Sequence, residues 1–531
     1  MFDVAIVGFG PTGAVLAGLL GQQGIGVYVC DQSLAVYPKP RAIALDHEIM
    51  RIFQQLGVER AIEPHTEAFT NSEYYGVEGQ LIKCMSTLPE PYPLSYVPSL
   101  VFSQPPVEAI IREQVSTLPS VTVELGQRCV GVEQGAKSVV LTLQDAKSQV
   151  KSIEAQYLIA CDGASSGVRK MQGFELEDLG FDQSWLVVDV LLNERGLQKT
   201  PQVSVQYCEP LRPSTYVIGP KNHRRWEIAI NAGEDPEQVA SQAGTWALLE
   251  RWITPQDGEL WRQASYRFHA LVAQTWRKDR VFLAGDAAHQ QPPFLGQGMC
   301  QGLRDAQNLA WKLASVLKGR AKDSLLETYG EERRMHVSAL TQRITHIGEL
   351  VGERDMERAR ARDTQLLADC AGQVVPTPRQ NVQPALSVGL LSHPVSGQAS
   401  GHAGARVTTV LGSVFPQPWL IHPQTHARVR MDQLLGQGWR LFLSETANAQ
   451  WDKVVLNEAM NVQVCRFDAR ALQECDGVVK AWFDEHRVQA ALVRPDHIVF
   501  GAYEDDRDRA NGGALGLTAL GQDLERLERF F

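Results

Sequence analysis

The chain has 531 residues, which is too long for one hydrophobic core, so we expect two or three domains. Its composition is ordinary for a globular protein, with 44% hydrophobic and 21% charged residues. The formal net charge of -10 argues against a nucleic-acid partner, because phosphate binding needs a basic surface. No apolar run approaches the roughly 18 residues that span a bilayer, so we expect no membrane partner.

Cysteine usage and the N-terminus bear on the compartment. The nine cysteines show neither a C-x-x-C pair nor the Cys/His spacing of a metal site, so we expect reduced thiols, no metal and a cytoplasmic protein. Residues 2–7 are predicted to be a strand with no charged leader before it, so we expect no signal peptide.

The first motif follows that strand. The glycines of G-x-G-x-x-G stand at positions 8, 10 and 13, a helix follows, and a second strand, 27–30, ends at Asp31. A strand, a helix, a second strand and an acid at this spacing predict a dinucleotide-binding βαβ unit. The alternative is a glycine-rich turn without a ligand.

Each residue of this unit has an expected role. Gly8 permits the tight turn, Gly10 lets the backbone approach a pyrophosphate, and Gly13 allows close packing of helix on strand. The helix N-terminus offers free N–H groups to the phosphates. Asp31 can accept hydrogen bonds from a ribose 2′-hydroxyl and would repel a 2′-phosphate, so the ligand is FAD or NAD rather than NADP.

A second stretch joins the apolar run 281–284 to a helix through G-D and G-Q-G. Asp286 can accept a hydrogen bond from a ribityl hydroxyl, and residues 296–299 can face the edge of a flavin from a helix N-terminus. The alternative for Asp286 is an ordinary helix or turn cap.

Three segments, taken with the fingerprint, resemble the group A flavoprotein aromatic hydroxylases over most of residues 1–345. They are P-R-A-I-A-L-D at 40–46, D-G-x-x-S-x-x-R at 162–169 and the G-D stretch. The resemblance implies FAD, O2, and NADH or NADPH as a transient co-substrate without a domain of its own. It implies these FAD-binding residues: Gly8, Gly10, Pro11, Thr12, Gly13, Asp31, Gln32, Arg41, Gln104, Asp162, Gly285, Asp286, Pro293, Gly296, Gly298 and Met299.

Within the family the chain is most similar to the 3-(3-hydroxyphenyl)propionate hydroxylase and phenol hydroxylase branch, on C-E-P-L-R-P at 208–213 and V-R-P-D at 493–496. This similarity implies ortho-hydroxylation of a small phenolic aromatic, such as 3-(3-hydroxyphenyl)propionate, through a flavin C4a-hydroperoxide. The chain departs from the branch at Asp46-His47, where a pair of acids is usual, and at 292–295, where P-V-W-Q is more common.

The resemblance leaves the groups around the phenol open. We expect His47 and Asp46 to help deprotonate it, and His289 either to approach the flavin or to hold its loop. The predicted substrate residues are Tyr207, Arg212, Tyr216, Pro293 and Phe294. The alternatives are a surface or helix-start histidine for His47, core packing for the two tyrosines and an ion pair for Arg212.

The predicted fold class is α/β. A FAD-binding Rossmann-like domain (1–175 and 271–345) carries an inserted β-sheet substrate domain (176–270), followed by a helix and linker (346–400). A thioredoxin-like C-terminal domain without C-x-x-C (401–531) follows. We interpret it as a structural or oligomerisation domain, with a homodimer as the candidate assembly.

Two other functions stay open at this point. One is a flavin-dependent tailoring oxygenase or epoxidase acting on a larger aromatic. The other is a flavin-binding protein without turnover. Oxidation of NAD(P)H that is stimulated by one phenol would select the hydroxylase.

Overall fold

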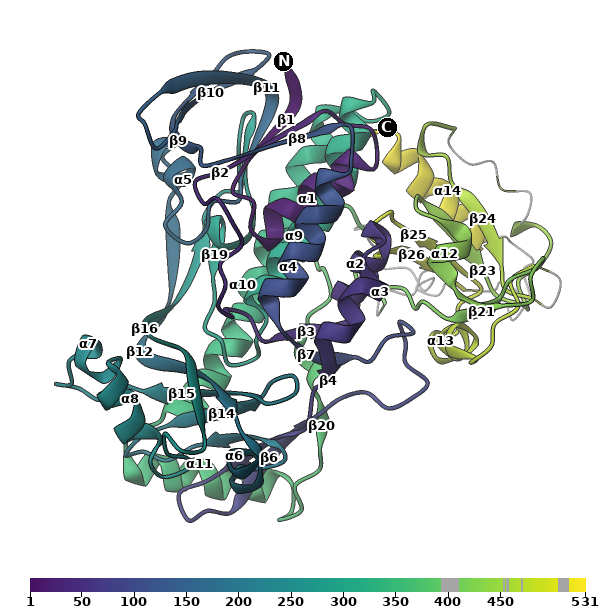
Figure 1. Ribbon diagram of the computed structural model, residues 1–531. Helices are drawn as coiled ribbons and strands as arrows, with labels where there is room; N and C mark the ends of the chain where they lie inside the picture. The colour runs from purple at the N-terminus through teal and green to yellow at the C-terminus, as the bar shows by residue number, and fades with distance from the viewer. Residues whose placement is uncertain (393–409, 452–453, 455–457, 469–470, 505–514) are drawn as a thin grey trace.

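The computed structural model of the chain describes residues 1–392, 410–451, 454, 458–468, 471–504 and 515–531. The end of the predicted linker and the first residues of the predicted C-terminal domain therefore lie outside the described residues. Figure 1 shows a sheet-and-helix body that contains the N-terminus, a second sheet at one end of it, and the C-terminal domain at its side.

The predicted βαβ unit is confirmed and forms the centre of an eight-stranded sheet. β1 (Phe2–Val7) pairs in parallel with β2 (Val27–Asp31) and with β11 (Val150–Ala160). Buried apolar runs suit parallel strands that are covered on both faces. The strand order is β17-β18-β11-β1-β2-β8, and β10 pairs with β11 on one side and with β9 on the other. The remaining bounds are β8 (Val121–Leu125), β9 (Arg128–Gln134), β10 (Val139–Gln144), β17 (Arg277–Lys278) and β18 (Val281–Leu283).

Helices cover this sheet. α1 (Pro11–Gly21) packs against α4 (Gln104–Ser116) and α9 (Gly298–Leu317), and the three lie side by side in Figure 1. α10 (Glu327–Gly352) packs on α9, and a short α5 (Gly167–Met171) follows β11. The apolar face predicted for α9 is buried as expected.

A small three-stranded sheet carries the segment after residue 40. Its order is β3-β7-β4, with β3 (Ala44–Asp46) antiparallel to β7 (Ser99–Phe102) and β4 (Thr66–Ala68) on the other side. α2 (His47–Leu56) begins directly after β3, and α3 (Glu59–Ile62) follows.

The second large sheet has nine strands in the order β19-β16-β12-β15-β14-β13-β5-β6-β20. The four strands predicted between residues 183 and 231 are confirmed within it. Four of its strands, β5, β6, β19 and β20, come from outside the predicted range 176–270. The bounds are β5 (Ser72–Tyr75), β6 (Leu81–Ser86), β12 (Leu176–Leu192), β13 (Ser204–Tyr207), β14 (Ser214–Ile218), β15 (His223–Ala229), β16 (Gly258–Ala273), β19 (His289–Gln290) and β20 (Thr377–Pro378).

Helices close the outer side of this sheet and lead out of it. The charged run near residue 355 forms the predicted helix, as α11 (Met356–Asp369), which contacts β6. The others are α6 (Glu194–Lys199), α7 (Pro236–Val239) and α8 (Gln242–Leu249).

The C-terminal domain has the thioredoxin-like order β24-β23-β25-β26, in which β23 and β24 are parallel and the other pairs antiparallel. The four strands predicted from the sequence are confirmed to within a few residues. The elements are β21 (Trp419–Ile421), β22 (Arg428–Arg430), α12 (Met431–Leu435), β23 (Arg440–Leu443), β24 (Gln463–Arg466), α13 (Val478–His486), β25 (Ala490–Val493), β26 (Val499–Tyr503) and α14 (Leu515–Leu527). All nine cysteines lie in described residues and are free thiols.

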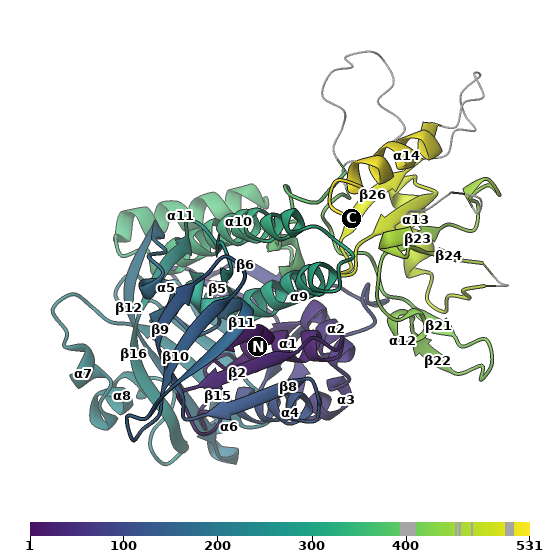
Figure 2. The same cartoon turned by 90° about the horizontal axis from the view of Figure 1, so that it is seen from above.

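A buried ion network joins this domain to the rest of the chain. Glu332 of α10 accepts from Arg494 Nη2 and from Lys312 Nζ of α9, both at 2.8 Å. Arg494 also pairs with Asp496 at 2.6 Å, and all four side chains are almost fully buried. A buried network of this kind fixes orientation, because every charge needs its partners. Figure 2 shows the C-terminal domain against the ends of α9 and α10.

No helix in the described parts of the chain combines the length and the apolar character that crossing a membrane requires.

We predict that Arg494→Met destabilises the docked C-terminal domain by about 3 kcal/mol, because it leaves buried carboxylates without a partner. The matched control is Arg428→Met, since that guanidinium pairs with Asp476 while 55% exposed and contributes less than about 1 kcal/mol. Urea unfolding followed by tryptophan fluorescence measures both. Equal losses in the two variants would contradict the prediction.

Candidate active site

The fingerprint loop is shaped by contacts that only glycine allows. Gly8 has φ +104°, and a Cβ there would overlap the carbonyl of Cys161 at the end of β11. A Cβ on Gly13 would overlap the Gly8 carbonyl, so α1 packs directly on the loop. A Cβ on Gly10 would meet no atom within 4 Å. The loop is therefore tight on its inner side and open at Gly10, beside the N-terminus of α1.

Asp31 ends β2 and holds this loop. Its Oδ2 accepts from the Phe9 N–H and its Oδ1 from the Ser33 N–H, each at 2.7 Å. The carboxylate lines the same cleft as Gly10, together with Gln32. The residue that was predicted to bind a ribose thus fixes the backbone of the fingerprint loop.

The second loop, which begins at Gly285 and leads into α9, lies against the fingerprint loop. Gly285 has φ +60°, and a Cβ on it would lie 2.6 Å from Thr12 Oγ1 at the start of α1. Asp286 follows on a single 3-10 turn, exposed to the cleft, and no described residue donates a hydrogen bond to it. Burial of the surroundings raises the pKa of its carboxyl group. An acceptor without a protein partner at this point suits a ligand hydroxyl.

The two loops face each other across a cleft of about 790 Å³. Its volume lies within the range of cofactor and ligand sites. Of the predicted FAD-binding residues, Gly13 and Gly285 pack behind the loops. The cleft is lined by all the others: Gly8, Gly10, Pro11, Thr12, Asp31, Gln32, Arg41, Gln104, Asp162, Asp286, Pro293, Gly296, Gly298 and Met299.

Two of these side chains hold neighbouring backbone in place. Gln104 Oε1 accepts from the Ala42 N–H at 2.7 Å and from the Arg41 N–H at 3.2 Å. Asp162 accepts from the Val168 N–H at 3.1 Å and from the Ser166 hydroxyl. Both therefore shape the wall of the cleft as well as lining it.

A smaller cavity, which we call the ring-side pocket, adjoins the cleft under the nine-stranded sheet. Its free volume is about 40 Å³, and it shares Ile43, Glu227, Pro293 and Gly296 with the cleft. Its remaining walls are formed by Ala44, Phe69, Ser72, Tyr74, Met85, Gln206, Thr215, Val217, Phe294, Leu295 and Arg379. The two substrate predictions at Pro293 and Phe294 fall on this pocket.

Two ionisable side chains in the ring-side pocket were not predicted. Glu227 of β15 is only 5% exposed, receives no hydrogen bond from the described residues, and has its pKa raised by burial to about 7. Arg379 stacks over the Phe69 ring at 3.5 Å and donates to the Ser72 hydroxyl, and burial lowers its pKa to about 10. No carboxylate of the described residues pairs with this guanidinium. The pocket thus presents a proton acceptor and a cation.

A sequence signal existed for Glu227 and not for Arg379. Trp226, Ile228 and Ile230 alternate along β15 and enter the apolar core on the far face of the sheet. Alternation places Glu227 on the opposite face, toward the cleft. Arg379 lies in the predicted linker, which forms β20 at the edge of the sheet, and nothing local indicates that pairing.

The three predicted catalytic residues do not line the ring-side pocket, and Asp46 and His47 line a small cavity beside it that shares Phe69 and Arg379 with it. Asp46 caps α2 and pairs with Arg304 at 2.7 Å; burial opposes its charge, but Arg304 lowers its pKa overall. His47, whose pKa is lowered by burial, also lines a larger cavity on the other side. His289 Nε2 bonds Asp305 at 2.8 Å and its ring stacks on Trp276. The loop-holding alternative for His289 is the one that the structure supports.

Three predicted substrate residues also lie outside both cavities. Tyr216 is in the core on the far face of the sheet, and its hydroxyl donates to the Pro201 carbonyl at 3.2 Å. Tyr207 packs on Trp252, and Arg212 pairs with Glu234 at 2.6 Å. The two tyrosines lie on strands whose register turns them away from the cleft, and Arg212 lies in the turn between those strands, so the core and ion-pair alternatives fit these positions.

Comparisons with known proteins bear on the ligand. Residues 1–344 match the family model described as FAD binding domain, and residues 412–515 match the HcaD C-terminal domain. A probable NADH-specific resorcinol 4-hydroxylase of Rhodococcus jostii is 35% identical over 96% of this chain and 93% of its own. A 3-(3-hydroxy-phenyl)propionate/3-hydroxycinnamic acid hydroxylase of Mycobacterium sp. is 30% identical over 94% of this chain and 89% of its own.

Solved structures share the fold of the whole chain. The flavin-dependent monooxygenase PieE, in complex with FAD and substrate, has a TM-score of 0.77 at 22% identity, covering 98% of this chain and 99% of its own. Aklavinone-11 hydroxylase, with FAD and aklavinone, has a TM-score of 0.77 at 21% identity, covering 99% of this chain and 98% of its own.

We predict that Asp286→Ala weakens FAD binding about ten- to a hundredfold, because a hydrogen bond to a charged acceptor contributes about 1.5–3 kcal/mol. Asp286→Asn keeps an oxygen acceptor and should lose less. Titration of the apoprotein with FAD, followed by flavin fluorescence, gives both dissociation constants. An alanine variant that binds FAD as tightly as the parent would remove Asp286 from the site.

Proposed function

This chain belongs to the family of FAD-dependent aromatic hydroxylases, and we propose that its substrate is a phenol with a second substituent at position 3. The new hydroxyl group would be added to a carbon next to the one that bears the phenolic hydroxyl. The names of two relatives support this substrate class, since resorcinol and 3-(3-hydroxyphenyl)propionate are both 3-substituted phenols. We propose NADH as the electron donor, on the name of the first relative.

The cleft fits the cofactor of this family. Open space at Gly10 and at Gly298, where a Cβ would meet no atom within 4 Å, leaves room for a ligand at the N-termini of α1 and α9. The first helix end would hold the pyrophosphate, Asp286 the ribityl chain, and the second helix end the edge of the ring. When bound, FAD supplies the redox chemistry, taking electrons from the nicotinamide and activating O2.

The ring-side pocket is the proposed phenol site. It adjoins the cleft through Pro293 and Gly296, so a phenol there would lie against the ring end of the cofactor.

Glu227 is the observation that carries the proposal. A phenol attacks an electrophilic oxygen far better as phenolate, so the site needs a base, and general bases act best with a pKa near the working pH. The carboxyl of Glu227, with its pKa raised to about 7 and no protein hydrogen bond among the described residues, meets both conditions. We assign it the role that the sequence had suggested for His47 and Asp46.

Arg379 would orient the second substituent. A guanidinium without a carboxylate partner attracts a propionate strongly and a neutral hydroxyl weakly. A phenol with a second polar substituent could contact the base through its hydroxyl and the cation through that substituent. The cytoplasmic location and the homodimer stay predictions.

Hydroxylation should depend on the ionisation of Glu227. Because burial raises its pKa to about 7, the carboxyl is protonated below that pH and cannot accept the phenol proton. We therefore expect the hydroxylation rate of the FAD-loaded enzyme to fall as the pH drops below about 7. Glu227→Gln should lower the rate about a hundredfold and abolish this pH dependence. Product formation in single turnovers measures both.

Glu73→Gln is the matched control, because Glu73 bonds Tyr75 at 2.6 Å and lines neither cavity. It should keep the parent pH profile. A Glu227→Gln enzyme with the parent rate and profile would refute the assignment.

Arg379→Met should separate the two candidate substrates. Loss of a charge-assisted bond should raise KM for 3-(3-hydroxyphenyl)propionate about ten- to a hundredfold and leave resorcinol within about threefold. Arg343→Met is the control, since that guanidinium donates outside the pocket to the Val382 carbonyl. Steady-state NADH oxidation gives the constants. Equal losses for both phenols would contradict a role in binding the substituent.

A further inference from the structure

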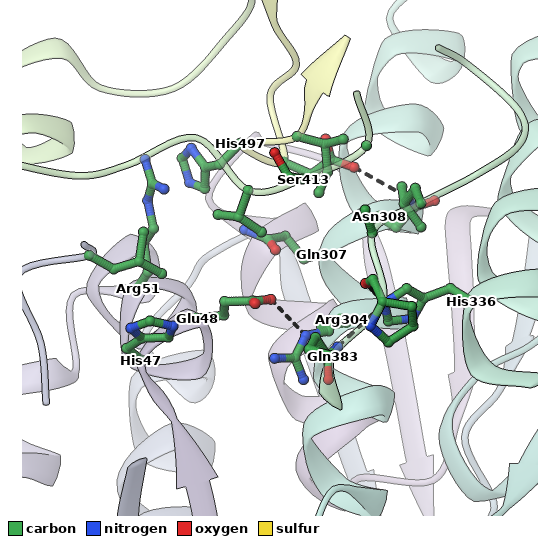
Figure 3. Close-up of a pocket in the computed structure, with 18 of the residues that line it drawn as sticks. His47, Glu48, Arg51, Arg304, Gln307, Asn308, His336, Gln383, Ser413 and His497 are labelled. Atoms are coloured by element: carbon green, nitrogen blue, oxygen red, sulfur yellow. Dashed lines mark hydrogen bonds and ion pairs between the residues drawn. The ribbon is translucent and has the colours of Figure 1, made fainter. Parts of the chain in front are cut away.

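A separate cavity of about 290 Å³, which we call the interface pocket, lies between the FAD-binding domain and the C-terminal domain. In Figure 3, His47, Glu48 and Arg51 of α2 face Ser413 and His497 of the C-terminal domain, with Asn308 of α9 and His336 of α10 on a third side. Its volume is at the lower end of the range for small-molecule sites.

Apolar side chains form much of its wall. They come from the loop before β7, the segment before residue 387 and the C-terminal domain: Leu88, Pro93, Leu94, Pro384, Leu386, Val414 and Ile498. A wall of this kind suits the faces of an aromatic ring.

Three polar atoms of the lining residues have no hydrogen-bond partner among the described residues. They are His47 Nδ1, Asn308 Oδ1 and Gln380 Oε1. His47 is 7% exposed and Asn308 4%, so water reaches them poorly from outside. Leaving such a group unpaired is unfavourable, because it has lost its hydrogen bonds to water. Two of the three are amide oxygens, which only accept, so the missing partner is a hydrogen-bond donor.

The charges around the interface pocket give no reason to expect an anionic ligand. Arg304 is paired with Asp46 and Glu48, both at 2.7 Å. The other two guanidinium groups that line it are also paired, Arg51 with Asp432 and Arg333 with Asp305. Every arginine in the lining is therefore neutralised, and the ligand that fits is neutral, apolar on its faces and equipped with O–H groups.

We propose that the interface pocket is a second binding site, and that it takes a neutral hydroxylated aromatic ring. The identification of this ring with the substrate or product class rests on the proposed function. A connecting cavity of about 80 Å³ supports it, because this cavity shares His47, Arg304 and Gln380 with the interface pocket and Phe69, Leu295 and Arg379 with the ring-side pocket. Only this connecting cavity would thus separate a ring in the interface pocket from the proposed phenol site.

The experiment compares two substitutions at Ser413, which lines the interface pocket and donates only to the Val410 carbonyl, at 2.6 Å. Ser413→Phe fills the pocket, while Ser413→Ala loses the same hydrogen bond and leaves the pocket open. Equilibrium dialysis with radiolabelled resorcinol, on the oxidised FAD-loaded enzyme without NADH, counts bound equivalents for each chain.

We expect Ser413→Phe to bind one equivalent fewer than the parent and Ser413→Ala to match the parent. Gln380→Leu, which removes one unpaired acceptor, should weaken the same equivalent if the phenylalanine variant folds poorly. A folded Ser413→Phe chain that binds as much resorcinol as the parent would overturn the proposal. Stimulation of NADH oxidation by resorcinol reports the ring-side pocket instead, so its absence would count against the proposed function alone.

Discussion

The site depends on one buried carboxylate, that of Asp305 in α9. Its Oδ2 accepts from the Gly285 N–H at 2.9 Å and from His289 Nε2 at 2.8 Å, and its Oδ1 accepts from Arg333 Nε of α10 at 2.8 Å. These bonds fix both ends of the turn that presents Asp286 to the cleft. They also fix α9 and α10 relative to that turn. An unpaired charge at this depth would cost several kcal/mol, so the three partners hold the loop in one conformation.

The second sheet contributes the ionisable side chains of the proposed phenol site. The FAD-binding domain presents backbone, glycines and the carboxylates of Asp31, Asp162 and Asp286 to the cleft, a composition that suits a cofactor. Reactive side chains for a phenol come from the other sheet, where strand alternation turns Glu227 toward the cleft and its neighbours into the far core. A phenol in the ring-side pocket would therefore lie between the cofactor cleft beside the first sheet and the ionisable side chains of the second. The C-terminal domain docks on α9 and α10 through the buried charges of Lys312, Glu332 and Arg494.

Sequence alone predicted what short-range spacing encodes. The glycines, Asp286 and the helix after them are set by neighbours a few residues away, so the cofactor cleft was predictable almost residue by residue. Polar residues near the substrate were not, because their direction depends on register and on distant partners. His289 belongs to the Asp305 cluster, and Tyr216 faces the far core. Arg379 reaches the pocket from a segment predicted to be a linker, through a two-residue strand at a sheet edge.

We propose that the phenol binds in the ring-side pocket with its hydroxyl on Glu227. A crystal structure of the FAD-loaded enzyme with a bound 3-substituted phenol tests this placement. We expect the phenol oxygen within hydrogen-bond distance of the Glu227 carboxylate and the second substituent toward Arg379. A phenol bound with its hydroxyl on His47, or on the far face of the sheet beside Tyr216, and with no contact to Glu227, would contradict it.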